Sequence, residues 1–348
     1  MRECVAVEVR DPLEWDALVA SMPFTSALQG WGWGEAKRLT GWEPYRLRVD
    51  RAGEAVAAAQ VLRRRLVPGA TVLYAPRGPA MRSLTDIADV GRALRRWAGR
   101  SDLRLKLEPP VPLAEDAEIP AALGPFRRAE TEQPEHTILV DLTAPEEVML
   151  KRMHQMARRN TKTSLKLGVT AGPDDDFDAF WALFSETNER SKLLSRTRAY
   201  YEAVYHECGR YGGEARLITA RLDGQALASG LVIGLGPNLN YLYGGSTRAR
   251  EEGERDPKGS NGFYWGMLLY GAQAGYRELD LFGIPRKLDP EKHAFGVYQF
   301  KERLGGQRVH FPAYELGLSP LARAVTAALR ARKTLMNYRA RGSTRDVL

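Results

Sequence analysis

Cysteine and long apolar runs are scarce in this sequence, and their scarcity excludes several classes of protein. Only Cys4 and Cys208 occur among the 348 residues, too few for a disulfide framework or a metal site built from cysteines. No apolar run reaches the roughly 18 residues of a transmembrane helix. The start of the chain lacks the apolar stretch of a signal peptide. We therefore expect a cytoplasmic protein with two unpaired thiols and no metal.

Acidic residues are fewer than basic ones, and the formal net charge is +8. This balance favours an anionic partner, which could be a nucleic acid, a phosphorylated metabolite or an anionic membrane. Apolar residues make up 44% of the sequence, enough to bury a substantial core. A chain of 348 residues with this composition predicts two domains.

Two stretches of the chain resemble each other in order and spacing. Residues 45–66 read as two strands joined by a turn, and residues 215–234 repeat the pattern around the hairpin signal Asp223-Gly224. Each copy continues with a third strand, a helix and a short strand. In the first copy the helix is 84–99 and the short strand is 103–107. In the second copy the helix is 260–276 and the short strand is 279–282. The order favours a mixed α/β fold of two tandem GNAT-like acyltransferase domains. The alternative is chance similarity between two unrelated α/β domains.

The domain boundaries follow from this duplication. A polar linker around residues 131–136 separates a first domain, 1–135 plus 314–348, from a second domain, 136–313. The last helix, from about Ser319, follows the second copy, and we expect it to pack back onto the first domain.

A turn suited to the pyrophosphate of acetyl-coenzyme A is missing from the expected place. Such a turn has glycines between a strand and a helix, so that backbone N–H groups point at the phosphates. Residues 29–34 match the pattern but precede the main sheet and contain two bulky tryptophans, whereas residues 210–215 lie between a helix and a strand, the wrong order. We therefore expect no cofactor and an acyl donor of another kind.

Several short motifs are spread between about Ser26 and Pro320. They are Leu28-Gln29-Gly30-Trp31-Gly32-Trp33-Gly34-Glu35-Ala36-Lys37, Gly41-Trp42-Glu43-Pro44, Pro76-Arg77-Gly78-Pro79, Arg158-Arg159-Asn160 with Lys162, Lys166 and Gly168, Arg196 with Tyr200, Tyr241-Leu242-Tyr243-Gly244-Gly245-Ser246, and Phe300-Lys301 before Gly305-Gly306. Each motif is weak alone, but in this order the set resembles the Fem family. Its members transfer amino acids from aminoacyl-tRNA to peptidoglycan precursors and contain two GNAT-like domains.

Some Fem members carry a long coiled-coil arm in the second domain. Here fewer than 30 residues separate Gly168 from Arg196, and they contain no sustained heptad pattern. The chain therefore resembles the armless members, some of which act on the soluble UDP-linked precursor. The resemblance implies aminoacyl-tRNA as donor and either UDP-MurNAc-pentapeptide or a lipid-linked precursor as acceptor.

The reaction implied by the resemblance is aminolysis of the ester that joins an amino acid to tRNA. Because this ester is already activated, the enzyme mainly orients the partners and stabilises an oxyanion. Lys301 matches the family's catalytic lysine, with Phe300 beside it, and Glu108 corresponds to an acidic position and is a candidate general base. A solvated lysine at a helix end and a carboxylate that caps a strand are the structural alternatives.

Four positions match the family's precursor-binding residues: Lys37, Arg196, Tyr200 and Tyr241. Their charged and hydroxyl donors suit a diphosphate and carboxylates. Tyr243 is a further candidate, because alternation along a strand places it on the same face as Tyr241. For both tyrosines of this strand, packing is the alternative.

Two basic stretches complete the candidate surfaces. The stretch 151–168, read as one helix, carries six cations and no acidic residue, and we expect Arg158, Arg159 and Lys162 to contact tRNA phosphates. A solvated helix face is the alternative. The basic, amphipathic C-terminal helix suits either packing against the first domain or peripheral contact with an anionic membrane.

Two other functions stay open at this point. One is a Fem-like N-acyltransferase that uses an acyl donor other than aminoacyl-tRNA. The other is a non-catalytic protein that binds RNA or the cell envelope, for which Lys301 would be dispensable.

Overall fold

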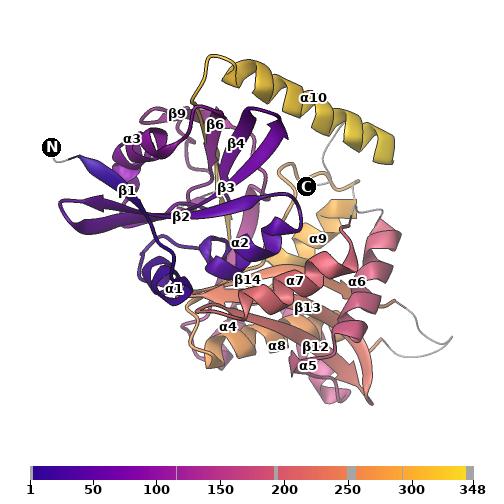
Figure 1. The fold of residues 1–348 in the computed structure, drawn as a ribbon. Coiled ribbons are helices and arrows are strands. Elements are labelled where there is room, and N and C mark those ends of the chain that lie inside the picture. The colour runs from indigo at the N-terminus through magenta and orange to yellow at the C-terminus, as the bar shows by residue number, and fades with distance from the viewer. Residues whose placement is uncertain (1–2, 115, 192–194, 249–255, 292, 342–348) are drawn as a thin grey trace. The chain divides into compact units, whose positions relative to one another are not determined.

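The computed structural model describes residues 3–114, 116–191, 195–248, 256–291 and 293–341 (Figure 1). Helices and strands are mixed along the chain, and they form two compact units. The first unit comprises Met1–Glu135, Arg210–Gly213 and Val309–Asp346, and the second is made mainly of His136–Gly209 and Glu214–Arg308. Among the described residues, no helix has the length and apolar content needed to cross a membrane.

The sheet of the first unit follows the strand order β1-β2-β3-β4-β6-β17-β9-β8, with β5 paired to β3. Its strands are β1 (Cys4–Glu8), β2 (Glu43–Arg51), β3 (Glu54–Val67), β4 (Ala70–Ala75), β5 (Ala80–Met81), β6 (Asp102–Leu107), β8 (Ala122–Leu123), β9 (Phe126–Ala129) and β17 (Ala313–Gly317). Strands β4 and β6 are parallel, whereas β17 runs antiparallel to both of its neighbours, β6 and β9. The last strand of the chain therefore lies in the interior of this sheet.

Helices cover this sheet: α1 (Pro12–Ala20), α2 (Trp31–Arg38), α3 (Ile87–Trp97) and α10 (Ala322–Arg341). Buried residues recur every three or four positions along α3, at Ile87, Val90 and Leu94, and this face joins the apolar core formed by the strands. Short 3₁₀ turns, Ala27–Gln29 and Leu84–Asp86, precede α2 and α3.

The sheet of the second unit follows the order β11-β12-β13-β14-β15-β10. Its strands are β10 (His136–Asp141), β11 (Thr170–Asp174), β12 (Glu214–Leu222), β13 (Gln225–Leu235), β14 (Asn238–Ser246) and β15 (Glu278–Asp280). Strands β14 and β15 are parallel, and the remaining neighbours in this series are antiparallel. Strand β16 (Gln307–His310) leads back to the first unit, where its Val309 and His310 pair with β7 (Leu113–Ala114).

The helices of the second unit are α4 (Glu146–Arg152), α5 (Gln155–Lys166), α6 (Phe177–Ser191), α7 (Arg198–Cys208), α8 (Gly259–Gln273) and α9 (His293–Glu302). Helix α8 is apolar on nearly all sides and is largely buried. Its glycines permit this close packing: a Cβ added at Gly266 would lie 2.5 Å from the Cβ of Ala171, and one at Gly262 would lie 2.7 Å from Ser164 Oγ. Larger side chains there would force α8 away from β11 and α5.

The duplication expected from the sequence is present in the structure. The series β2-β3-β4-α3-β6 and β12-β13-β14-α8-β15 have the same order, and each ends with a parallel strand pair. Both copies even carry a register shift just before the first hairpin turn, between Val49 and Asp50 and between Ala220 and Arg221. A shared β-bulge is hard to reconcile with chance, because bulges are specific local features of a strand pair. The mixed α/β fold class is confirmed.

Candidate active site

Lys301 lies in the last turn of α9 and is buried, with 7% of its surface exposed. Its Nζ donates hydrogen bonds to the carbonyl oxygens of Phe282, at 2.7 Å, and Gly283, at 2.9 Å. Burial lowers the pKa of the Lys301 ammonium to about 8, while the carboxylate of Asp280 acts in the opposite direction. Lys301 is therefore not a solvated lysine at a helix end, but a cation held in place by two carbonyls.

The two carbonyls are presented by the turn that follows β15. Phe282 adopts a left-handed backbone conformation with φ 56°, and its N–H donates to Asp280 Oδ1 at 2.8 Å. Asp280 is buried and also accepts hydrogen bonds from Thr137 and, at 3.4 Å, from Asn240 Nδ2. Asp280 thus fixes the turn that orients Lys301. Sequence reasoning missed this residue, although an aspartate that ends a short strand before Phe282-Gly283 is a recognisable turn signal.

Aromatic rings pack against one another beside Lys301. Phe300 packs against Tyr264, with ring centroids 5.0 Å apart, and Tyr264 contacts Tyr241 at 5.5 Å. The Nζ of Lys301 lies 5.8 Å from the centroid of the Tyr241 ring. Burial raises the pKa of Tyr241 to about 12, so its hydroxyl is neutral at physiological pH. Phe300, Lys301 and Tyr241 are therefore brought together, with Tyr264, which was not predicted, as their neighbour.

Tyr243 does not share a face with Tyr241, so that expectation from strand alternation was wrong. Leu231 pairs with Tyr243 but the next residue, Val232, pairs with Tyr241, which leaves Leu242 as an extra residue on β14. This bulge shifts the alternation by one position. A Cβ on Gly244 would meet the Tyr241 hydroxyl at 2.2 Å, so Gly244 faces the same way as Tyr241.

Tyr243 instead joins Arg196 and Tyr200 on the opposite face of β14. Its hydroxyl lies 3.4 Å from that of Tyr200, and the Arg196 guanidinium lies 5.6 Å from the centroid of the Tyr200 ring. The hydroxyl of Tyr201 accepts the backbone N–H of Arg196 at 3.0 Å. Burial raises the pKa of Tyr200 to about 12. The predicted precursor-binding residues of this unit therefore divide between two faces of one strand.

Lys37 and Glu108 belong to the first unit. Lys37 is half-buried in α2, with its Nζ 4.0 Å above the ring of Trp33. Glu108 is fully buried, and its carboxylate accepts hydrogen bonds from Tyr74 Oη at 2.6 Å and from the backbone N–H groups of Glu132, at 2.6 Å, and Gln133, at 3.1 Å. Burial raises the pKa of Glu108. These hydrogen bonds hold the segment before His136 in place. The role of Glu108 as a general base stays a prediction.

The basic stretch expected as one helix over 151–168 is two helices, and that expectation was wrong in this respect. Met153 has an extended backbone, and the ring of His154 accepts the N–H of Met156 at 3.2 Å, which ends α4 and begins α5. Arg159 and Lys162 are exposed on α5. Arg158 is half-buried and donates to the carbonyl oxygen of Lys151 at 3.1 Å, so it also joins the two helices.

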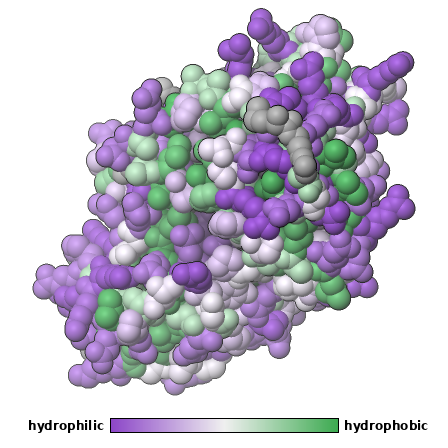
Figure 2. All heavy atoms as spheres, turned by 90° about the vertical axis from the view of Figure 1, so that its left-hand side faces the viewer, coloured by the Kyte–Doolittle hydropathy of each residue, from purple (hydrophilic) through white to green (hydrophobic). Residues whose placement is uncertain are grey.

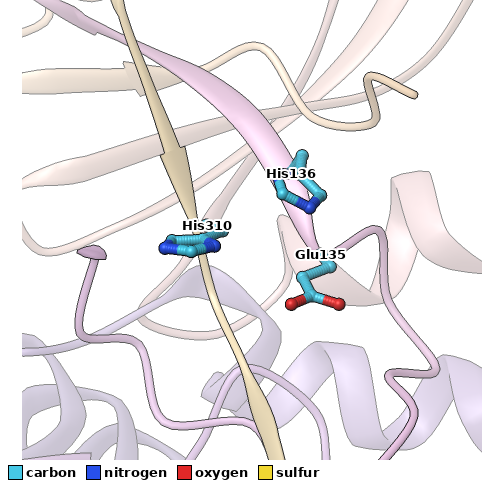
Figure 3. Close-up of side chains that lie close together, drawn as sticks. All are labelled: Glu135, His136 and His310. Carbon is cyan, nitrogen blue, oxygen red and sulfur yellow. The ribbon is translucent and has the colours of Figure 1, made fainter. Parts of the chain in front are cut away.

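One group of side chains has atoms suited to binding a metal ion. Glu135, His136 and His310 have ligand atoms within 4.8 Å of one another (Figure 3). The carboxylate of Glu135 forms an ion pair with Arg128, and a guanidinium competes with a metal ion for the same oxygens. We therefore assign no metal to this group.

Comparison with known proteins connects these features to a family. Residues 124–226 match the model of the FemAB family. The chain is 29% identical over 233 residues to the lipid II:glycine glycyltransferase of Staphylococcus aureus, which covers 60% of this chain. The crystal structure of FemX matches 92% of this chain and 99% of its own, with a TM-score of 0.77 and 20% sequence identity.

Residues 124–226 of this chain are thus similar to the FemAB family, and the chain shares the fold of FemX. The match covers 53% of the staphylococcal glycyltransferase, so this chain corresponds to about half the length of that relative. A tandem GNAT protein from the clavulanic acid biosynthesis pathway shares the fold, with a TM-score of 0.51 over 91% of this chain and 99% of its own, at 14% identity. The chain thus has the GNAT-like fold expected from its duplication. Between Gly168 and Arg196, the described residues form β11 and the 15-residue helix α6, which is no long helical arm.

Proposed function

We propose that this protein belongs to the FemAB family and transfers an amino acid from aminoacyl-tRNA to the stem-peptide amine of a peptidoglycan precursor. In this reaction the amine attacks the ester carbonyl carbon, a C–N bond forms, and the C–O bond to the ribose breaks. The proton lost by the amine goes to the ribose oxygen, so the step needs no further reactant. The name of the staphylococcal relative, a lipid II:glycine glycyltransferase, supports this class of reaction.

The buried ammonium of Lys301 is the observation that carries the proposal. Among the described residues its acceptors are the carbonyls of Phe282 and Gly283, whereas an ammonium has three N–H donors. The remaining donor is available to the oxyanion that forms on the ester carbonyl. In a site with little water, such a preorganised cation stabilises the developing charge strongly. With a pKa of about 8, Lys301 is largely protonated at neutral pH and can fill this role.

The other predicted residues have binding roles in the proposal. Arg196, Tyr200 and Tyr243 on one face of β14, and Tyr241 on the other, are candidate donors to the phosphates and carboxylates of the precursor, either UDP-MurNAc-pentapeptide or its lipid-linked form. Lys37 of the first unit is a further candidate. The exposed cations of α5 meet the phosphates of tRNA. Because both the charged tRNA and the UDP-linked precursor are cytoplasmic molecules, we place the reaction in the cytoplasm or at the inner face of its membrane.

The test of this function uses purified protein, UDP-MurNAc-pentapeptide and a pool of charged tRNAs. Mass spectrometry should show the precursor gaining one or more amino acid residues, and ribonuclease should abolish the gain. A gain that survives ribonuclease would favour a Fem-like N-acyltransferase with another acyl donor. No gain, with a lipid-linked precursor also tried, would rule out transfer to peptidoglycan precursors.

Replacing Lys301 tests the site itself. Lys301→Ala removes the donor to the oxyanion, and we expect kcat to fall by about 10²–10³-fold with little change in precursor affinity. Lys287→Ala removes an exposed lysine before α9 and is the matched control, with activity close to that of the parent. If Lys301→Ala keeps its turnover, the protein binds its ligands without using this lysine in catalysis.

A further inference from the structure

Helix α10 packs on the first unit by one side only. Ala322 is buried, and Val325, Thr326 and Leu329 are half-buried, a spacing that places them on one face. The hydroxyl of Thr326 donates to Glu315 Oε1 on β17 at 2.7 Å, which fixes the first half of the helix. The second half extends beyond the strands of this unit (Figure 1). From Arg330 onward, every side chain that the structure describes on this helix is exposed.

The outer side of α10 is apolar as well. Isolated exposed apolar residues are ordinary, and Figure 2 shows hydrophobic residues interspersed with hydrophilic ones on one face of the protein. The exposed apolar residues of α10 differ from these because they form a continuous strip along the helix. At 3.6 residues per turn they fall within a sector of roughly 100°, opposite the packed face. Its members are Ala324, Ala327, Ala328, Ala331, Leu335 and Tyr338, of which Leu335 is 48% exposed and Tyr338 58% exposed.

Arginines border this strip on both sides. Arg323 and Arg330 lie along one edge and Arg332 and Arg339 along the other, and all four are exposed. The sequence of α10 contains no acidic residue. Arg330 lies 3.5 Å from Glu130, but both side chains are more than half exposed, so this ion pair contributes little. A helix that packs on its own domain ordinarily has a polar outer face, and this one does not.

We infer that the outer face of α10, defined by this strip and its four arginines, is a docking surface for membranes that contain anionic lipid. An apolar strip between two rows of arginine suits the boundary between acyl chains and headgroups, where long arginine side chains extend to the lipid phosphates. RNA also presents phosphates, but it offers no apolar phase for Leu335 and Tyr338. The inference does not depend on the proposed reaction. If that reaction holds, docking brings the protein to the membrane that carries a lipid-linked acceptor.

Vesicle binding tests this surface directly. The parent protein should sediment with vesicles of phosphatidylcholine and phosphatidylglycerol but not with vesicles of phosphatidylcholine alone. Leu335→Glu/Tyr338→Glu replaces the exposed strip residues with acids, and its affinity for the anionic vesicles should fall at least tenfold. Leu13→Glu changes a leucine of α1 that is 62% exposed, and this variant should bind like the parent.

Three outcomes would overturn the inference: no binding to anionic vesicles, equal binding to neutral ones, or undiminished binding by the double variant. A fragment of duplex RNA serves as a second probe. If RNA binding alone is lost in Arg323→Glu/Arg339→Glu, with no binding of the parent to vesicles, the surface belongs to nucleic acid. Transfer to a soluble acceptor should be unchanged in the strip variant. The vesicle assay needs no activity, so failure of the proposed function is distinguishable from failure of docking.

Discussion

The protonation state of one buried residue, Lys301, sets the conditions under which the proposed site can work. Burial removes water from its ammonium and lowers the pKa to about 8. Below this pH the residue is a cation that can stabilise an oxyanion, and above it the residue is a neutral amine that cannot. Activity should therefore fall as the pH rises through about 8. Asp280 keeps the pKa from falling further, because its negative charge favours the protonated lysine.

Replacing Asp280 should shift the basic limb of the pH profile, which is the fall in activity above about pH 8. Asp280→Asn removes the negative charge but keeps acceptor and donor groups for the turn at Phe282, so we expect the limb to shift downward by roughly 0.5–1 pH unit. The measurement is kcat/KM between pH 6 and 9.5. Glu278→Gln alters a carboxyl on the same strand and serves as the control. A uniform loss of activity with an unmoved limb would mean that Asp280 only holds the turn.

At the scale of helices and strands, the features that could be predicted from the sequence depend on neighbouring residues. The features that could not be predicted depend on pairing between segments distant in the chain. Hairpin signals and helical periodicity depend on neighbouring residues, so the repeated strand-strand-strand-helix-strand order was accessible. The bulge at Leu242 depends on how β13 aligns with β14, and nothing in Tyr241–Ser246 itself reveals the extra residue. The same holds for the break between α4 and α5, where the N–H of His154 donates to the carbonyl of the distant Arg303 at 2.9 Å.

Helix α5 allows the tRNA hypothesis to be tested without disturbing the core. Arg159→Glu/Lys162→Glu changes two exposed side chains, and we expect weaker tRNA binding with a slope of log K against log salt reduced by about 2. Fluorescence anisotropy of labelled tRNA at several salt concentrations gives both quantities. Arg95→Glu/Arg100→Glu makes the same charge change on exposed residues of the first unit. Equal losses in both variants would indicate only a general effect of net charge.

At the scale of the whole molecule, the two units are similar in fold but differ in how the chain completes them. The sheet from β11 to β10 is built within His136–Arg308, so the second unit needs no distant segment for it. The first unit places β17, which follows the entire second unit in sequence, between β6 and β9. Its sheet therefore closes only after the rest of the chain exists, and closing so long a loop costs conformational entropy. Each unit has its own apolar core.

Because each unit has its own apolar core, a cavity made in one core should destabilise that unit and leave the other unchanged. Leu105 on β6 and Leu279 on β15 are fully buried at corresponding short strands, and truncating either to alanine should destabilise its own unit by about 2–5 kcal/mol. Hydrogen exchange followed by mass spectrometry should show faster exchange in the strands of the first unit for Leu105→Ala. For Leu279→Ala the faster exchange should be confined to the second unit. If either variant loosens both sheets equally, the duplicated units unfold as one cooperative structure, and the independence implied by their two cores is wrong.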